Sequence, residues 1–380
     1  MNHISFQPER WNGTHLSISV GTDGSEEKLN FVFDEVIPLE EDSLAIALST
    51  LCGTRFDRID FGFPVSSSVV SGIAEWTGSD VQASGSLDFI PNKKDGSNAV
   101  LNFSGGLDSL ASKFLLGDCE LVSLDFGGRF SRERNFFQQF DTRIIETNIV
   151  TTGLRSNSWS FMGIGPLLLA NCFESPYFAF GSILEASQLR LNAPASAAHT
   201  FPPFKLAGYE SVAPVAGISE VGTVLLVLRH NPDLLSKSLL SLASPGEEKY
   251  FRKIALAQLV DDIFGFGIDA PPLPTSQKVH YKFGQNFAVD LTALLLFAYG
   301  RTEQAEALVS GVPTEISSQL SAGDFDFMFK TDPRFYEQYP DALRGPLEDG
   351  LRRGGLGWYS SRDYESVSKI REILTGYYAF

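Results

Sequence analysis

One hexapeptide of the chain combines the backbone and side chains that phosphate binding requires. Two consecutive glycines let backbone N–H groups approach an anion with no Cβ between them. A carboxylate and a hydroxyl follow at once, where a helix N-terminus would add partial positive charge. The pattern therefore predicts an anion site, although a Gly-rich turn with Asp108 as a helix-capping acid is an alternative. The six residues are Ser104, Gly105, Gly106, Leu107, Asp108 and Ser109.

The segments on either side of this hexapeptide predict a strand, a turn and a helix. Residues 99–103 form a short apolar, partly β-branched run that is typical of a buried strand. Residues 107–116 favour a helix whose first turn contains Asp108 and Ser109. No GK[ST] follows the turn, which has no lysine, and the spaced glycines of dinucleotide-binding folds are absent. The loop is therefore neither a Walker loop nor a Rossmann fingerprint.

The hexapeptide resembles the SGGxDS signature of the PP-loop ATP pyrophosphatase superfamily. The resemblance implies that ATP is cleaved between its α and β phosphates, with Mg²⁺ as the metal cofactor. Asp108 would hold Mg²⁺ or cap the helix, and both roles stay open. The pyrophosphate would be held by the two serine hydroxyls and the loop amides, which assigns ATP binding to Ser104, Gly105, Gly106, Leu107, Asp108 and Ser109.

Two further segments look like parts of one family within this superfamily, the 7-cyano-7-deazaguanine synthases. Residues 123–129 (SLDFGGR) stand where that family has a strand end, and the resemblance implies an adenosine pocket at Asp125, Phe126 and Arg129. A strand that ends in a Gly-Gly turn is the alternative. Residues 214–223 look like the start of the family's next helix, although the lysine of that pattern is Glu220 here.

The chain departs from these synthases where they hold a structural zinc with four cysteines. Residues 239–253 contain neither cysteine nor histidine, the ligands that zinc prefers, so no zinc is expected. The same segment carries a basic cluster, Lys249, Arg252 and Lys253, which we expect to be surface charges. The peptidoglycan-precursor glutamate epimerases have a similar overall layout, with an ATP-dependent domain and a C-terminal extension.

Positive charge must reach the phosphates from outside the loop. Arg155 follows the third predicted strand near Trp159, on the expected ligand side, and is our candidate for a substrate or phosphate clamp. Glu185 follows the fourth predicted strand and is a candidate to bind substrate or act as a base, while a helix-start role is the alternative. The candidate catalytic residues are Asp108, Arg155 and Glu185.

Composition indicates the cellular location and excludes some classes of partner. The net charge of −16 argues against a broad nucleic-acid-binding face. No apolar stretch is long enough to span a membrane, and residues 1–15 contain no apolar signal core, so we expect a cytoplasmic protein. The three cysteines are widely separated and are expected to be reduced.

The order of the expected elements predicts an α/β fold with a doubly wound parallel sheet of the PP-loop type. From Asn98 onward, strands alternate with helices, and ligands of such sheets bind at the carboxyl ends of the strands. We expect an N-terminal α+β domain over residues 1–95 and an ATP-binding domain over residues 98–275, joined by a polar linker over residues 91–97. Residues 280–380 are expected to form a C-terminal helical appendage.

These observations predict an enzyme that adenylates a small-molecule carboxylate and releases AMP and pyrophosphate during ligation, amidation or epimerisation. One alternative is epimerisation of the glutamate of a UDP-muramoyl-dipeptide. Another is a non-catalytic nucleotide-binding module that acts with a partner protein. Sulfur transfer to tRNA is disfavoured by the negative charge and the absence of a paired catalytic cysteine motif. Oligomer formation stays open.

Overall fold

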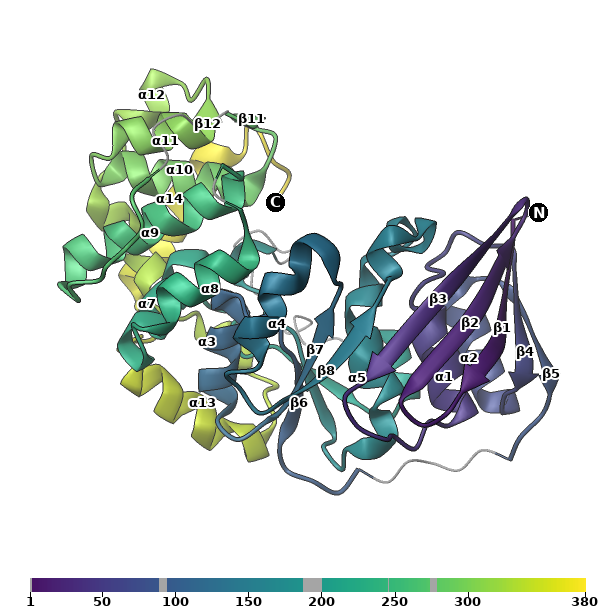
Figure 1. Cartoon of the computed structure of the whole chain (residues 1–380). Helices are drawn as coiled ribbons and strands as arrows, with labels where there is room; N and C mark the ends of the chain where they lie inside the picture. Colours follow the sequence, from purple (N-terminus) through teal and green to yellow (C-terminus); the bar gives the residue numbers. More distant parts are fainter. Residues whose placement is uncertain (1, 89–93, 187–199, 245, 274–278) are drawn as a thin grey trace. The chain divides into compact units, whose positions relative to one another are not determined.

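The computed structural model describes residues 2–88, 94–186, 200–244, 246–273 and 279–380 (Figure 1). Part of the expected linker, residues 91–93, lies outside the described residues. Contacts divide the chain into two compact units, one within residues 1–104, 118–180 and 199–212, the other within residues 105–117, 181–198 and 213–380. Each unit joins segments from more than one of the three expected domains. The boundaries near residues 95 and 280 stay predictions.

The first unit contains a ten-stranded sheet in the order β10-β9-β6-β7-β8-β3-β2-β1-β4-β5. Six of its nine strand pairings are parallel, and the antiparallel ones join β8 to β3, β3 to β2 and β2 to β1. The strands are β1 His3–Trp11, β2 His15–Thr22, β3 Ser25–Phe33, β4 Arg58–Pro64, β5 Asp80–Gly85, β6 Ala99–Asn102, β7 Glu120–Asp125, β8 Thr142–Thr147, β9 Tyr177–Ala179 and β10 Glu210–Val212.

The expected α/β class with a mostly parallel central sheet is confirmed, and the arrangement is consistent with a doubly wound fold. All four strands expected from Asn98 onward are present as β6 to β9, and they lie side by side in the order β9-β6-β7-β8. Every residue of β6 is buried, as its continuous apolar run predicts for a central parallel strand. The N-terminal strands extend this same sheet beyond β8 (Figure 1).

The helices of the first unit are α1 Glu41–Ser49, α2 Ser67–Thr77, α4 Ser131–Phe137, α5 Ile164–Leu168 and α6 Pro202–Leu206. Between β8 and β9, α5 is short. The chain forms two 3-10 turns there, Trp159–Gly163 and Ala170–Cys172, on either side of α5. A Cβ on Gly163 would lie 2.3 Å from the Phe204 ring, so this glycine serves close packing where a good helix former could not stand.

The second unit is mainly helical. Residues 280–380, which were expected to be helical, contain the helices α10 to α14. Within the described residues, no helix is both long and apolar enough to cross a membrane. The elements are α3 Leu107–Leu116, α7 Glu220–His230, α8 Leu234–Leu242, α9 Glu248–Phe264, β11 Tyr281–Lys282, α10 Phe287–Ala298, α11 Thr302–Leu308, β12 Val309–Ser310, α12 Thr314–Ser317, α13 Asp341–Arg353 and α14 Ser361–Leu374.

Candidate functional site

The glycine-rich turn connects β6 to α3 as the sequence predicts. β6 ends at Asn102 and α3 begins at Leu107, with Gly106 as its N-cap. Gly105 has a φ of +71°, in the left-handed region where a side chain would be strained. Its carbonyl oxygen accepts a 2.8 Å hydrogen bond from the hydroxyl of Ser238 in α8. The turn is therefore fixed both by glycine chemistry and by a buried side chain from another helix.

The backbone after β9 passes close to the start of α3. A Cβ on Gly181 would lie 2.9 Å from the backbone nitrogen of Ser109 and 3.0 Å from the carbonyl carbon of Asp108. The Ser109 hydroxyl donates a 3.0 Å hydrogen bond to the carbonyl oxygen of Gly106. This part of the loop is closely packed, and only a glycine fits at position 181.

Asp108 is anchored through one of its two carboxylate oxygens. Its Oδ1 atom lies 2.8 Å from the Lys253 ammonium and accepts a 2.9 Å hydrogen bond from the Thr223 hydroxyl. The Lys253 side chain is 2% exposed, whereas that of Asp108 is 29% exposed. Neither of these two bonds uses Oδ2. The carboxylate is thus held in place from the protein side while part of it faces solvent.

The charge of Asp108 is set by opposing effects. Burial by itself would raise the pKa of Asp108, but the positive charge of Lys253 and the Thr223 hydrogen bond outweigh it and hold the pKa below its ordinary value. The charge of Lys249 acts in the same direction. Asp108 is therefore ionised at neutral pH.

Lys253 belongs to a buried network of alternating charges. Its ammonium also lies 2.9 Å from Oε1 of Glu220, the first residue of α7. Glu220 forms a second ion pair with Arg252, whose Nε lies 2.6 Å from Oε1 of Glu248. Burial lowers the pKa of Lys253, and the neighbouring Asp108 opposes that shift. Two carboxylates thus share one buried ammonium, and they compensate the cost of removing it from water.

The basic cluster of α9 was expected to consist of surface charges, but only part of it does. Arg252 and Lys253 lie three and four residues after Lys249, which places both beside it on one side of α9. Lys253 is buried and Arg252 is 13% exposed, so the expectation is wrong for these two. Lys249 is exposed, as expected. The cluster places positive charge beside Asp108.

Glu185 is buried beside the same network. It lies in a 3-10 turn, Leu184–Ala186, and both of its carboxylate oxygens accept the backbone N–H of Glu220, at 2.8 and 2.9 Å. Burial raises the pKa of Glu185 to about 8, and the negative charge of Asp108 adds to the shift. The structure therefore brings together two of the three predicted catalytic residues, Asp108 and Glu185, through α7 and α9.

Sequence reasoning missed Thr223 and the bridging role of Glu220. Both lie in the first turn of α7, whose N-cap is Ser219. The Ser219 hydroxyl accepts the N–H of Gly222 at 3.0 Å and donates to the Met328 carbonyl at 2.6 Å. The available signal was the three-residue spacing of Glu220 and Thr223, which puts both on one side of a helix start. Glu220 was expected only as a departure from the lysine of the family pattern, and its ion pairs with Lys253 and Arg252 were not predicted.

Asp125 and Phe126 belong to the first unit, at the carboxyl end of β7. The Asp125 carboxylate is buried, accepts the Gly127 N–H at 2.8 Å and pairs with Arg134 at 2.9 Å. Phe126 is half-buried and packs against Phe130, with ring centroids 5.9 Å apart. Asp125 thus shapes the Gly-Gly turn directly, which is what the alternative interpretation expected of this segment.

The remaining predicted site residues also lie in the first unit. Ser104 ends one of its segments, and Arg155 is an exposed residue of a 3-10 turn, Gly153–Ser156. Arg129 lies in a 3-10 turn over residues 128–130, and its side chain is outside the described residues. Arg155 therefore does not belong to the described network around Asp108.

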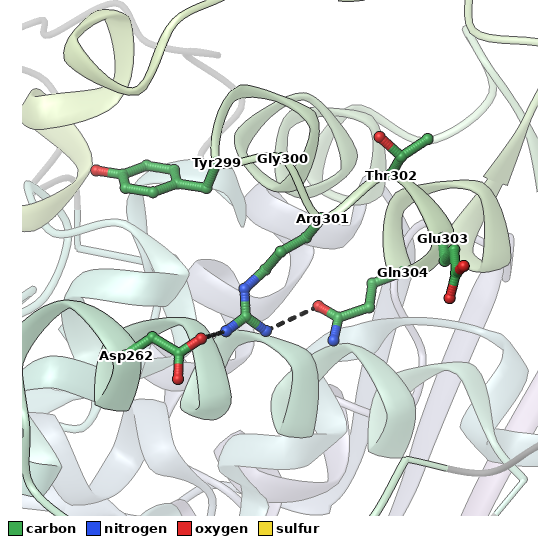
Figure 2. A pocket seen from close by; sticks show the side chains of 7 residues that line it. All are labelled: Asp262, Tyr299, Gly300, Arg301, Thr302, Glu303 and Gln304. Carbon is green, nitrogen blue, oxygen red and sulfur yellow. Dashed lines mark hydrogen bonds and ion pairs between the residues drawn. The ribbon is translucent and has the colours of Figure 1, made fainter.

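An open pocket of about 600 Å³ lies elsewhere in the second unit (Figure 2). Its central cation, Arg301, forms an ion pair with Asp262 and donates a 3.0 Å hydrogen bond to Gln304. The guanidinium is therefore already neutralised. The lining residues are Asp262, Tyr299, Gly300, Arg301, Thr302, Glu303 and Gln304.

Among the described residues, no group of three or more His, Cys, Asp or Glu side chains is placed to hold a metal ion. A metal at Asp108 would need further oxygen ligands from a phosphate or from water. Comparison of the chain with protein-family models, with curated proteins and with solved structures found no match.

Proposed function

We propose that the chain is an ATP-dependent enzyme of the PP-loop type that adenylates a substrate carboxylate and releases pyrophosphate. The observation that carries the proposal is the anchored carboxylate of Asp108. It stands in the first turn of α3, directly after the Ser-Gly-Gly turn, and Lys253 and Thr223 hold it through one oxygen. A residue that only capped the helix would need no buried lysine from a helix 145 residues away.

The turn supplies the neutral part of a phosphate site. Gly105 and Gly106 have no Cβ to stand between the backbone amides and an anion, and α3 adds the partial positive charge of its N-terminus. The bonds from Ser238 to Gly105 and from Ser109 to Gly106 fix the turn before a ligand arrives. Such preorganisation lowers the entropy cost of binding.

Lys249 is the residue we assign to the phosphate oxygens. It lies one helical turn before Lys253 on α9, is exposed, and its charge acts on Asp108. Lys253 cannot take this role without giving up its ion pairs with Asp108 and Glu220. The two lysines therefore have different roles: Lys253 positions Asp108, and Lys249 binds the leaving pyrophosphate.

Asp108 fits Mg²⁺ as a single carboxylate ligand. The ion is a hard cation that prefers oxygen, and it commonly binds one or two carboxylates together with substrate phosphates. The Oδ2 atom of Asp108, which the Lys253 and Thr223 bonds do not use, is the atom that would hold it. When bound, Mg²⁺ would neutralise charge on the pyrophosphate as it leaves.

The reaction follows from these placements. A substrate carboxylate oxygen bonds to the α-phosphorus while the bond from that phosphorus to the α,β-bridging oxygen breaks. The electron pair stays on pyrophosphate, and the substrate becomes an acyl-adenylate. The nucleophile needs no base, because a carboxylate is already ionised at neutral pH. Glu185, largely protonated at that pH, suits hydrogen-bond or proton donation to the substrate better than proton abstraction.

The test uses ATP labelled separately at the α and γ phosphates, with Mg²⁺ and a pool of carboxylic acids that includes UDP-linked muramoyl peptides and 7-carboxy-7-deazaguanine. We expect substrate-dependent AMP and pyrophosphate from the wild type and from Lys282→Ala, an exposed lysine of β11 that serves as the control. Asp108→Asn should abolish both products. ADP with phosphate would contradict adenylation, and tight ATP binding without turnover would instead favour the nucleotide-binding module.

A further inference from the structure

The indole of Trp159 is the most exposed aromatic side chain in the described part of the chain. It is 63% exposed, at the start of the 3-10 turn that precedes α5. Single exposed apolar residues are common on protein surfaces and need no explanation by themselves. What distinguishes Trp159 is how firmly the first unit holds it.

The turn that bears Trp159 is tied to the end of α1. The Asn157 side chain donates a 3.0 Å hydrogen bond to the Leu51 carbonyl, and the Ser160 hydroxyl donates a 2.9 Å bond to the Thr50 carbonyl. A Cβ on Gly53 would lie 2.8 Å from the Asn157 carbonyl oxygen, which shows how closely the two segments pack. The backbone on either side of Trp159 is thus anchored in the interior.

The ring itself rests on two other aromatic rings. Its centroid lies 5.7 Å from that of Phe180, at an interplanar angle of 64°, and 5.6 Å from that of Phe201, at 37°. Phe180 packs in turn against Phe178 and Phe204. One edge contact and one tilted contact thus hold the indole, while 63% of the residue stays exposed. Trp159 is therefore a preoriented aromatic surface in solvent.

The position of this surface in the sheet is where α/β proteins bind ligands. Phe180 comes directly after β9 ends at Ala179, and the turn of Trp159 belongs to the connection that follows β8. β8, β7, β6 and β9 are parallel neighbours, so their carboxyl ends lie along one edge. Ligands of open α/β sheets bind outside that edge.

The same connection also offers a cation. Arg155, four residues before Trp159, is exposed, and no ion pair of its side chain occurs within the described ranges. An aromatic face combined with a guanidinium is how proteins hold the planar, electron-rich rings of nucleobases and related heterocycles.

We propose that Trp159 forms a stacking site for a planar heteroaromatic ring, with Phe180 and Phe201 holding the indole in place. The ring can come from two sources, the adenine of a nucleotide or the heterocycle of a second substrate. Ring binding requires no turnover, so it can be tested apart from the proposed adenylation.

The experiment is a ¹⁹F NMR titration of the full chain labelled with 5-fluorotryptophan. The chain has four tryptophans, and Trp159→Phe assigns the resonance of interest. Trp358, which is 44% exposed, is the matched control for nonspecific ring contacts. The probes are AMP, GMP and UMP, with ribose 5-phosphate as the ligand that lacks a ring.

We expect a saturable shift of the Trp159 resonance with at least one nucleotide, none with ribose 5-phosphate, and none at Trp358. Trp159→Leu should bind that nucleotide about tenfold more weakly or worse in calorimetry, and Trp159→Phe should keep most of the affinity. A response to AMP alone identifies adenine as the ring, and a response to the other bases that persists with saturating ATP identifies a second substrate. No shift with any base, equal shifts at Trp358, or unchanged affinity in Trp159→Leu would overturn the proposal, whatever the pyrophosphate assay gives.

Discussion

The Lys253 ammonium lies 2.8 Å from Oδ1 of Asp108 although 145 residues separate the two in the chain. This contact joins the first turn of α3 to the first half of α9, and through Glu220 it includes the first turn of α7. The Lys253 side chain is 2% exposed, so its substitution tests stability. The Asp108 side chain is 29% exposed, so its substitution also tests ligand binding.

The first prediction separates the two lysines of α9. Lys253→Met should lower the free energy of unfolding by about 3–5 kcal/mol, because it leaves Asp108 without its buried counter-ion and Glu220 with Arg252 alone. Lys249→Ala should change stability by no more than about 0.5 kcal/mol, since it removes an exposed side chain. Urea unfolding measures both, and Lys282→Ala provides the baseline for loss of an exposed lysine.

The same variants then enter the pyrophosphate assay. In our proposal, Lys249→Ala raises the KM for ATP about tenfold or more, while its melting temperature stays that of the wild type. Equal KM values for Lys249→Ala and Lys282→Ala would show that Lys249 does not meet the phosphates.

The second prediction concerns the sign of the charge at position 220. Glu220→Lys places a third cation beside Arg252 and Lys253, so we expect a loss of at least 3 kcal/mol of stability, roughly the cost of breaking a buried ion pair. Glu220→Gln keeps the shape and should cost less. The double variant Glu220→Lys with Arg252→Glu should recover part of the loss.

A thermal-unfolding double-mutant cycle measures this coupling. If the effects of the two substitutions simply add, Glu220 and Arg252 do not interact in solution as they do in the structure.

The local parts of this site could be read from the sequence, and the long-range parts could not. The turn between β6 and α3 follows from Gly105 and the apolar run before it, because both signals lie within ten residues. The burial of Lys253 depends on how α9 packs against α3 and α7, and no spacing within α9 distinguishes a buried lysine from an exposed one. Charged residues are rarely buried, so the surface interpretation was the reasonable one and failed at this position.

The strands of the sheet likewise divide into those that local sequence signals predict and those that they do not. The four parallel strands from β6 to β9 were predicted from composition and order, whereas β1 was not. Pro8 stands within β1, and the pairing register with β2 shifts between Pro8 and Arg10. A proline inside a strand normally argues against the assignment, and a bulge is the arrangement that tolerates it. The pairing of β3 with β8, which joins the N-terminal strands to the rest of the sheet, leaves no local signal.

The third prediction is a pH dependence of stability that Glu185 controls. The pKa of Glu185 is raised from its ordinary 4.5 to about 8, so the folded protein holds a proton that the unfolded chain has lost between these values. Stability should therefore fall by about 1.4 kcal/mol per pH unit at most between about pH 5 and 8, and level off above pH 8. Glu248, whose pKa burial raises to about 6, adds to the fall in the lower part of that range.

Glu185→Gln removes this titration and keeps an oxygen to accept the N–H of Glu220. We expect the variant to melt at a higher temperature than the wild type at pH 8 and at about the same temperature at pH 5. Scanning calorimetry from pH 5 to pH 9 checks this. Parallel melting curves for the two proteins across the range would show that Glu185 is ionised in the folded state, and its assignment as a proton donor would then fall.

The last prediction tests whether the loop must be close-packed to function. A methyl group at position 181 would lie 2.9 Å from the Ser109 nitrogen, a contact with backbone that no side-chain movement relieves. Gly181→Ala should therefore displace the start of α3, cost about 1–3 kcal/mol of stability, and weaken ATP binding. Gly376→Ala is the matched control, because Gly376 is exposed and nothing lies within 4 Å of its added methyl group. Urea unfolding and ATP calorimetry on both variants separate the outcomes: loss of stability together with ATP affinity in Gly181→Ala alone places the nucleotide at this loop, whereas destabilisation with unchanged ATP affinity would move the phosphate site away from Asp108.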